Sequence, residues 1–154
     1  PARSELNRVA GVDVSGSPEE VYATILEVGE EEFDELMDET ESRGRVIDAL
    51  VAHMAKSLRP EAAGDLDATI HVKLWDRPGG GYDHRELIIR DGHCTASDEP
   101  SEEPDLTLKV RPGDLRRIVT GEAGPKRLAF RGRLRVIGDL GLATRLTDIF
   151  DLGS

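Results

Sequence analysis

The clearest pattern of apolar and polar positions lies near the C-terminal end, between Arg127 and Phe150. From Phe130 to Val136, apolar residues and a glycine alternate with arginines, and this period of two predicts a strand. Gly138 and Asp139 interrupt the alternation, with Asp139 as the expected N-cap of a helix. Apolar residues then recur at helical spacing, at Leu142, Leu146, Ile149 and Phe150. The pattern predicts one amphipathic terminal helix that covers the apolar face of a sheet.

Helical signals dominate the chain from residue 17 to residue 60. Ser17 precedes Pro18 and two glutamates, a sequence typical of a helix start. A second helix is predicted from about Glu30, with an interruption at Gly44. Its apolar spacing then continues until Pro60 stops it.

Alternation replaces helical spacing from Leu66 onward. It predicts strands at 66–75, 82–90, 93–97 and 106–110, with a tight turn at residues 91–92. A helix is expected from Pro112, with Leu115, Ile118 and Val119 facing inward. Together with the strand at 130–136, this order predicts an α+β fold with a five-stranded, mostly antiparallel sheet, helices packed on one face and an amphipathic C-terminal helix. We expect the other face to carry His71, Lys73, Arg131, Arg133 and Arg135.

The net charge of the chain excludes some classes of function. The chain has 154 residues and a formal net charge of −11, which argues against general binding of nucleic acids. The stretch from Glu27 to Glu41 holds nine carboxylates and no basic residue. It is interpreted as a solvated helix face or, alternatively, as a docking surface for a basic partner. Because Cys94 is the only cysteine and no apolar run reaches the roughly 18 residues of a membrane span, we expect a soluble, cytoplasmic protein.

No catalytic or metal-binding pattern is found. His93 and Cys94 are adjacent on a predicted strand, so their side chains point to opposite faces and cannot act as base and nucleophile. His53, His71, His84 and His93 lack the spacing of metal ligands. The last three would approach each other only if the first three strands are neighbours. We therefore expect no enzyme activity, no cofactor and no metal, and an enzyme that uses these histidines is a distant alternative.

Three segments resemble the sterol carrier protein type 2 family. They are residues 104–110 (PDLTLKV), residues 114–121 with the short helix that ends in glycine, and residues 130–139 (FRGRLRVIGD) before the terminal helix. Their order and spacing are similar to those of the stand-alone members in high-GC Gram-positive bacteria. The resemblance covers residues 43–151, which leaves residues 1–42 as an acidic, helical N-terminal extension.

The resemblance implies an apolar tunnel, closed by the terminal helix, that accepts a fatty acid, an acyl-CoA, a sterol or a similar lipid. Such a protein would bind or transfer its ligand without catalysis. A ligand-free interaction or dimerisation module is the alternative, and the implied partners are a lipid, a transient membrane contact and a second copy in a homodimer. The same residues also suit an ordinary filled core. The expected pocket residues are Ile70, Val72, Leu74, Leu87, Ile89, Leu106, Leu108, Leu115, Ile118, Val119, Phe130, Leu134, Val136, Leu142, Leu146, Ile149 and Phe150.

Overall fold

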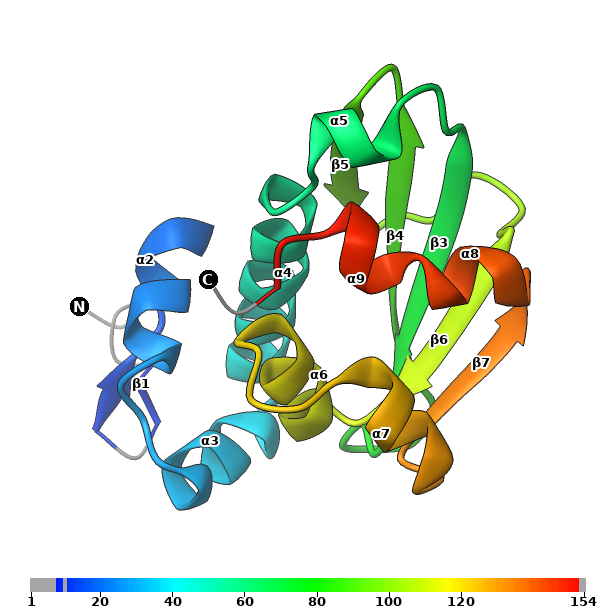
Figure 1. Ribbon diagram of the computed structural model, residues 1–154. Coiled ribbons are helices and arrows are strands. Elements are labelled where there is room, and N and C mark those ends of the chain that lie inside the picture. Colours follow the sequence, from blue (N-terminus) through cyan, green and yellow to red (C-terminus); the bar gives the residue numbers. More distant parts are fainter. Residues whose placement is uncertain (1–7, 10, 153–154) are drawn as a thin grey trace.

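A five-stranded mixed sheet lies at the centre of the computed structural model, which describes residues 8–9 and 11–152 (Figure 1). The strand order is β5-β4-β3-β6-β7. Their bounds are β3 Ala68–Leu74, β4 Asp83–Arg90, β5 His93–Ser97, β6 Leu106–Val110 and β7 Leu134–Gly138. β3 and β6 pair in parallel, and every other pair in this sheet is antiparallel. The predicted α+β fold with a largely antiparallel five-stranded sheet is confirmed.

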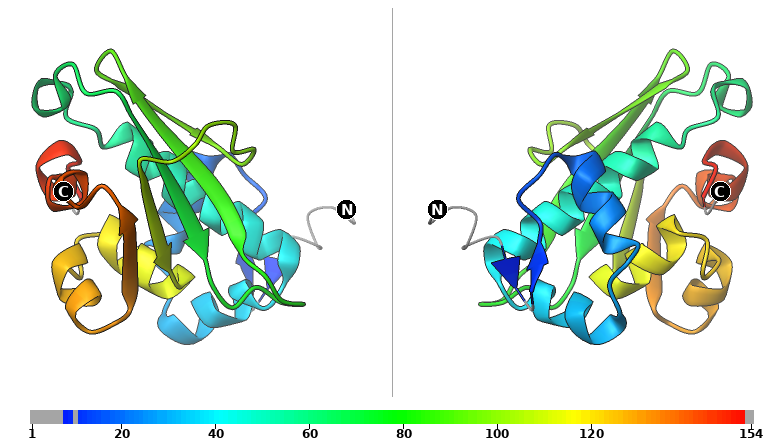
Figure 2. Two further views of the ribbon diagram at one scale, coloured as in Figure 1. Left: turned by 90° about the vertical axis from the view of Figure 1, so that its right-hand side faces the viewer. Right: turned by 90° about the vertical axis from the view of Figure 1, so that its left-hand side faces the viewer.

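Helices cover one face of the sheet, and none formed by residues 8–9 or 11–152 lies over the other face (Figure 2). The long helix α4 (Thr40–Lys56) packs against β4 and β5, and α6 (Pro112–Val119) packs against α4. The short helices are α5 (Pro60–Ala63), α7 (Pro125–Phe130), α8 (Leu140–Thr144) and α9 (Leu146–Ile149). Alternate strand residues such as Ile70, Val72 and Leu74 are fully buried under this layer. In the described part of the chain, no helix is long and apolar enough to cross a bilayer.

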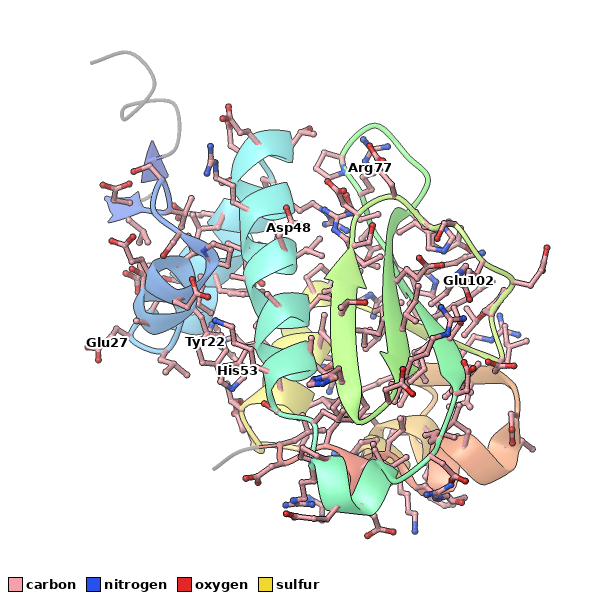
Figure 3. The ribbon with its side chains drawn as sticks, turned by 90° about the horizontal axis from the view of Figure 1, so that it is seen from above. Tyr22, Glu27, Asp48, His53, Arg77 and Glu102 are labelled. Atoms are coloured by element: carbon pink, nitrogen blue, oxygen red, sulfur yellow. The ribbon has the colours of Figure 1, made fainter. Side chains whose placement is uncertain are left out.

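The N-terminal region packs against α4 as a small helical layer. It contains α2 (Pro18–Ile25), α3 (Glu30–Met37) and a hairpin of β1 (Arg8–Val9) and β2 (Val12–Asp13). Ser17 caps α2 and exchanges hydrogen bonds with Glu20, as its position predicted. Tyr22 of α2 stacks on His53 of α4 with ring centroids 3.8 Å apart, and Figure 3 shows the two side by side.

The predicted helix break at Gly44 is wrong. The chain breaks earlier, at Asp38 and Glu39, and Gly44 lies inside α4. The hydroxyl of Ser42 donates to the carbonyl oxygen of Leu36 at 2.6 Å, which satisfies a free carbonyl at the end of α3. A hydrogen bond from a side chain to the end of the preceding helix leaves no periodic signal in the sequence.

The predicted strand at 130–136 also begins too early. Phe130 ends α7 and is 93% exposed, so it does not belong to the core. Pro125 occupies the first turn of α7, where its fixed φ favours a helix, and Gly132 adopts a positive φ of 75° in the turn that follows. The strand therefore starts only at Leu134. Arg131 and Arg133 lie before the strand, and Arg135 alone of the three is on its outer face.

The terminal amphipathic segment is buried as predicted but is divided into two short helices. The side chain of Asp139 accepts a hydrogen bond from the backbone N–H of Leu142 at 3.0 Å, which confirms the N-cap. A break at Arg145 separates α8 from α9. All four residues of the predicted stripe are buried, at 5% exposure or less.

Candidate functional site

An apolar hollow lies between the sheet and the terminal helices. It is lined entirely by apolar residues, which come from α4, β3, β6, α6, α7, β7 and α9, and from Leu152 after α9. Its volume is about 10 Å³. We call this place the apolar site, and its lining residues are Met54, Val72, Leu108, Val110, Leu115, Ile118, Pro125, Leu134, Leu146 and Leu152.

The apolar site is closed in this conformation. A hollow of about 10 Å³ has room for roughly one water molecule and none for a lipid chain. A ligand of lipid size would therefore enter only if part of the wall moved.

Six of the expected pocket residues line the apolar site, namely Val72, Leu108, Leu115, Ile118, Leu134 and Leu146. Nine others are buried in the surrounding core, namely Ile70, Leu74, Leu87, Ile89, Leu106, Val119, Leu142, Ile149 and Phe150. Val136 is half-buried, and Phe130 is outside the core altogether. Met54 and Val110 were missed although their spacing already marked them as inward-facing. Pro125, the first residue of α7, and Leu152, in the loop after α9, belong to no predicted apolar stripe.

One wall of the apolar site is formed by the terminal segment, residues 139–151, which we call the cover segment. At its start, the N–H of Asp139 donates to the carbonyl oxygen of Asp105 at 2.8 Å. At its end, the N–H of Arg59 donates to Ile149 at 2.7 Å, and the N–H of Asp151 donates to Ser57 at 2.7 Å. The cover segment is thus attached by its backbone at both ends.

The guanidinium group of Arg59 adds side-chain contacts at the C-terminal attachment. It donates to the carbonyl oxygens of Thr147 at 3.0 Å and Asp148 at 3.2 Å. It also forms an ion pair with Asp151 at 3.0 Å. One exposed side chain therefore holds three residues of the cover segment, and it does so without entering the apolar site.

A polar cluster lies on the opposite face of the sheet. His71 Nε2 is 3.1 Å from a carboxylate oxygen of Glu86, and His84 Nε2 is 2.9 Å from His71 Nδ1. The expectation that His71 lies on an exposed face is wrong, because it is only 6% exposed. The loop between β5 and β6, in which Figure 3 labels Glu102, covers this part of the sheet.

Hydrogen bonds keep the buried Glu86 ionised. Burial acts to raise the pKa of its carboxyl, but the backbone N–H groups of Glu102 and Ser101 and the ring of His71 outweigh it and lower the pKa. Burial lowers the pKa of His84, and the charges of His71 and Lys73 add to this effect. The cluster is therefore satisfied internally.

The remaining candidates for chemistry lie apart from one another. His93 is at the exposed start of β5, where it pairs with Arg90 rather than with the other histidines. Burial raises the pKa of the Cys94 thiol to about 12, so the thiol stays protonated at neutral pH. Among the described residues, no group of three His, Cys, Asp or Glu side chains could hold a metal ion.

A larger surface hollow of about 520 Å³ lies between α3 and α6, but its lining is highly charged. Arg117 pairs there with Glu30 and with the buried Asp114, which also pairs with Arg133. The guanidinium carbon of Arg116 lies 4.8 Å from the ring centroid of Phe33. Because a lipid tail would have to replace these ion pairs, this hollow does not suit an apolar ligand.

A model of the SCP-2 sterol transfer family matches residues 47–151, which is more than half of the chain. The chain belongs to this family. Among its relatives, the sterol carrier protein 2 of Oryctolagus cuniculus is 27% identical over 77 residues, and that of Homo sapiens is 26% identical over the same length. Each match covers 50% of this chain but only 14% of the relative.

Solved structures share the fold of this SCP-2 family member. The stereoselective inverting sec-alkylsulfatase Pisa1 from Pseudomonas sp. matches with a TM-score of 0.61 and 19% identity, over 73% of this chain and 17% of the sulfatase. The UbiJ-SCP2 ubiquinone synthesis protein matches with a TM-score of 0.53 and 17% identity, over 70% of this chain and 92% of that protein. At these identities, the similarity establishes the fold.

Proposed function

We propose that this SCP-2 family member binds or transfers a hydrophobic ligand, such as a fatty acid, an acyl-CoA or a sterol, at the apolar site and without catalysis. The observation that carries the proposal is the convergence of residues from seven helices and strands, together with Leu152, on one wholly apolar hollow. Membership of a sterol transfer family and the names of the sterol carrier relatives support the ligand class. The domain would comprise residues 43–151, with residues 1–42 as an N-terminal extension.

Ligand entry would require the cover segment to move. Between its two attachments, α8 and α9 have five and four residues, too few to be stable helices without packing. Their stability rests on Leu142, Leu146, Ile149 and Phe150, which a ligand tail could replace as apolar neighbours of the sheet. Each buried methylene group of the ligand would contribute about 0.8 kcal/mol to this exchange.

Native mass spectrometry tests the proposal directly. The freshly purified chain would be measured as isolated and again after incubation with palmitate, palmitoyl-CoA or cholesterol. The expected result is a mass increase equal to one ligand for at least one of these compounds. An unchanged mass with all three would contradict the proposal and favour the ligand-free interaction module.

A matched pair of variants locates the bound ligand. Leu146→Asp puts a charge into the apolar site, whereas Thr147→Asp puts the same charge on the exposed side of α9. Binding of a fluorescent fatty acid should be lost in the first variant and kept in the second. Val110→Phe fills the hollow without adding a charge and should also weaken binding. This second variant keeps the test valid if Leu146→Asp does not fold. Equal binding by the wild type and Val110→Phe would place the ligand elsewhere.

A further inference from the structure

Three cations lie directly opposite one another on the face of the sheet that the helices leave uncovered. Lys73 of β3 is in register with Lys109 of β6, which in turn is in register with Arg135 of β7. Neighbouring strands are about 4.8 Å apart, so the row places three positive charges within about 10 Å. Like charges in this position destabilise a sheet. The row gives this face a local positive charge that an anion would offset.

The sheet edge beside this row is also basic. Between Lys126 and Gly138 the sequence contains five cations and no acidic residue, in a chain whose net charge is −11. Within the described residues, Arg133 pairs with Asp114, whereas Lys126, Arg127, Arg131 and Arg135 are exposed and have no carboxylate partner. We call the row of Lys73, Lys109 and Arg135, together with Lys126, Arg127 and Arg131, the basic edge.

Exposed apolar side chains accompany these charges. Phe130 at the end of α7 is 93% exposed, Leu140 at the start of α8 is 62% exposed, and Ile137 on β7 is 45% exposed. They lie before, within and just after the edge strand β7. A large apolar side chain that is almost fully exposed beside cations needs a partner that offers both an apolar phase and negative charge.

The basic edge and the acidic helix α3 lie on opposite sides of the molecule. α7, β7 and α8 form the right-hand side in Figure 1, whereas α2 and α3 lie on the left. The left-hand view of Figure 2 shows the uncovered sheet face together with α7 and α8, and α2 and α3 lie behind it. An anionic surface would therefore attract one side of the molecule and repel the other, which fixes the orientation of approach.

We propose that the basic edge docks on an anionic phospholipid bilayer. The cations would contact the headgroup phosphates, while Phe130 and Leu140 would enter the boundary between headgroups and acyl chains. A bilayer is wide enough to contact both ends of β7 at once, and it lies next to α8 at the start of the cover segment. The biological purpose of this docking rests on the proposed lipid-binding function, but its measurement does not require a bound ligand.

Flotation with lipid vesicles tests the docking surface. The full chain would be mixed with vesicles of phosphatidylcholine alone or with 30% phosphatidylglycerol, at about 0.05 M and 0.5 M salt. We expect binding to the anionic vesicles at low salt only. Arg131→Glu should lower this binding at least fivefold, since one basic residue near an anionic surface accounts for about that factor. Phe130→Ser should reduce it as well.

Matched controls exist on the other side of the molecule. Lys56→Glu reverses an exposed charge on α4, and Leu26→Ser removes an exposed leucine after α2. Both should bind vesicles like the wild type. If Arg131→Glu and Lys56→Glu lose vesicle binding equally, the effect comes from net charge alone and the proposal is overturned. A wild type that does not bind anionic vesicles would also overturn it.

Two further measurements distinguish a failure of the docking proposal from a failure of the proposed lipid-binding function. Sedimentation velocity without vesicles should show the same oligomeric state for the wild type and Arg131→Glu. If the wild type is a dimer and Arg131→Glu is a monomer, the basic edge is a subunit interface and the bilayer proposal is overturned. Fatty-acid binding in vesicle-free solution should be unchanged by Arg131→Glu. Loss of vesicle docking with retained fatty-acid binding would thus leave the proposed function intact.

Discussion

Arg43 and Asp83 form an ion pair with a distance of 2.5 Å between Nε and Oδ2, although their side chains are only 2% and 10% exposed. The guanidinium group of Arg43 also donates to the carbonyl oxygens of Trp75 at 2.5 Å and Asp76 at 3.0 Å. It therefore connects the first turn of α4 to the end of β3 and the start of β4. Its donors thus satisfy a carboxylate and two main-chain carbonyl groups at one point of the fold.

Loss of Arg43 should destabilise the fold strongly. Arg43→Met keeps much of the apolar stem but leaves Asp83 and two carbonyl groups short of a donor, so we expect a loss of about 3 kcal/mol in the free energy of unfolding. Lys56→Met breaks an exposed ion pair on the same helix and should cost less than about 1 kcal/mol. Urea denaturation of both variants measures the difference. Similar values for the two would show that the buried pair has no special role.

Gly138 allows the end of β7 to approach Asp105 closely. A Cβ atom at this position would lie 2.5 Å from the carbonyl oxygen of Asp105, and φ is 111°. Gly138→Ala should therefore be more destabilising than Gly132→Ala, whose φ of 75° is also positive but whose added Cβ meets no atom within 4 Å.

For Gly132→Ala we expect a loss of about 1–2 kcal/mol, from the backbone conformation alone. Gly138→Ala should lose at least 1 kcal/mol more, because the backbone of Asp105 must move. Thermal unfolding of the two variants separates the steric contribution from the conformational one. Equal melting temperatures would mean that the contact with Asp105 relaxes without cost.

Arg59 should control how fast a ligand leaves. Arg59→Ala removes the side-chain contacts to Thr147, Asp148 and Asp151 but no residue of the apolar site. Under the proposed function, stopped-flow displacement of a fluorescent fatty acid should show a dissociation rate raised by about fivefold or more, in line with the loss of about 1 kcal/mol of hydrogen bonding. Arg90→Ala, which removes exposed ion pairs to Asp67 and Glu102, is the matched control and should leave the rate unchanged.

His84 should make stability depend on pH in the mildly acidic range. Its pKa is lowered in the folded protein, mainly by burial, so the unfolded chain binds the proton more readily. Stability is then complete above the ordinary pKa of 6.5 and falls as the pH drops below it. His84→Gln retains an N–H donor toward His71 but does not titrate. Unfolding by urea at pH 7 and pH 5 should show a smaller loss for this variant than for the wild type.

His93→Gln is the control for that experiment, since it changes a surface histidine and leaves the cluster of His71, His84 and Glu86 in place. It should show the wild-type difference between pH 7 and pH 5. If His84→Gln instead behaves like the wild type, the pH dependence comes from other groups, among which His53 also has a pKa lowered by burial.

The periodic parts of the fold could be predicted from the sequence because burial imposes them directly. Alternation placed Val72 and Leu108 inward on the central strands, and helical spacing placed Leu142 and Leu146 against the sheet. The errors occurred where short-range chemistry competes with the pattern. At Phe130, seven alternating residues looked like a strand, but Pro125 had already started a helix.

The state of the apolar site could not be predicted in the same way. Met54, Val110 and Leu152 could pack into a filled core or line an open cavity. Which of the two forms depends on how side chains from distant parts of the sequence pack together. The burial of His71 likewise depends on hydrogen bonds from Ser101 and Glu102 to Glu86, which belong to a loop without periodicity. Neither property is local to any one stretch of sequence.

The double attachment of the cover segment limits the motions open to it. A segment held at Asp139 and again at Ile149–Asp151 can bow outward in the middle, but it cannot rotate away as a hinged arm does. Under the proposed function, a slender acyl chain could thread beneath such an arch end-on, whereas a rigid fused-ring molecule has a wider cross-section and would need one attachment to be released first. The cover segment would then select ligands by width before they reach the apolar site.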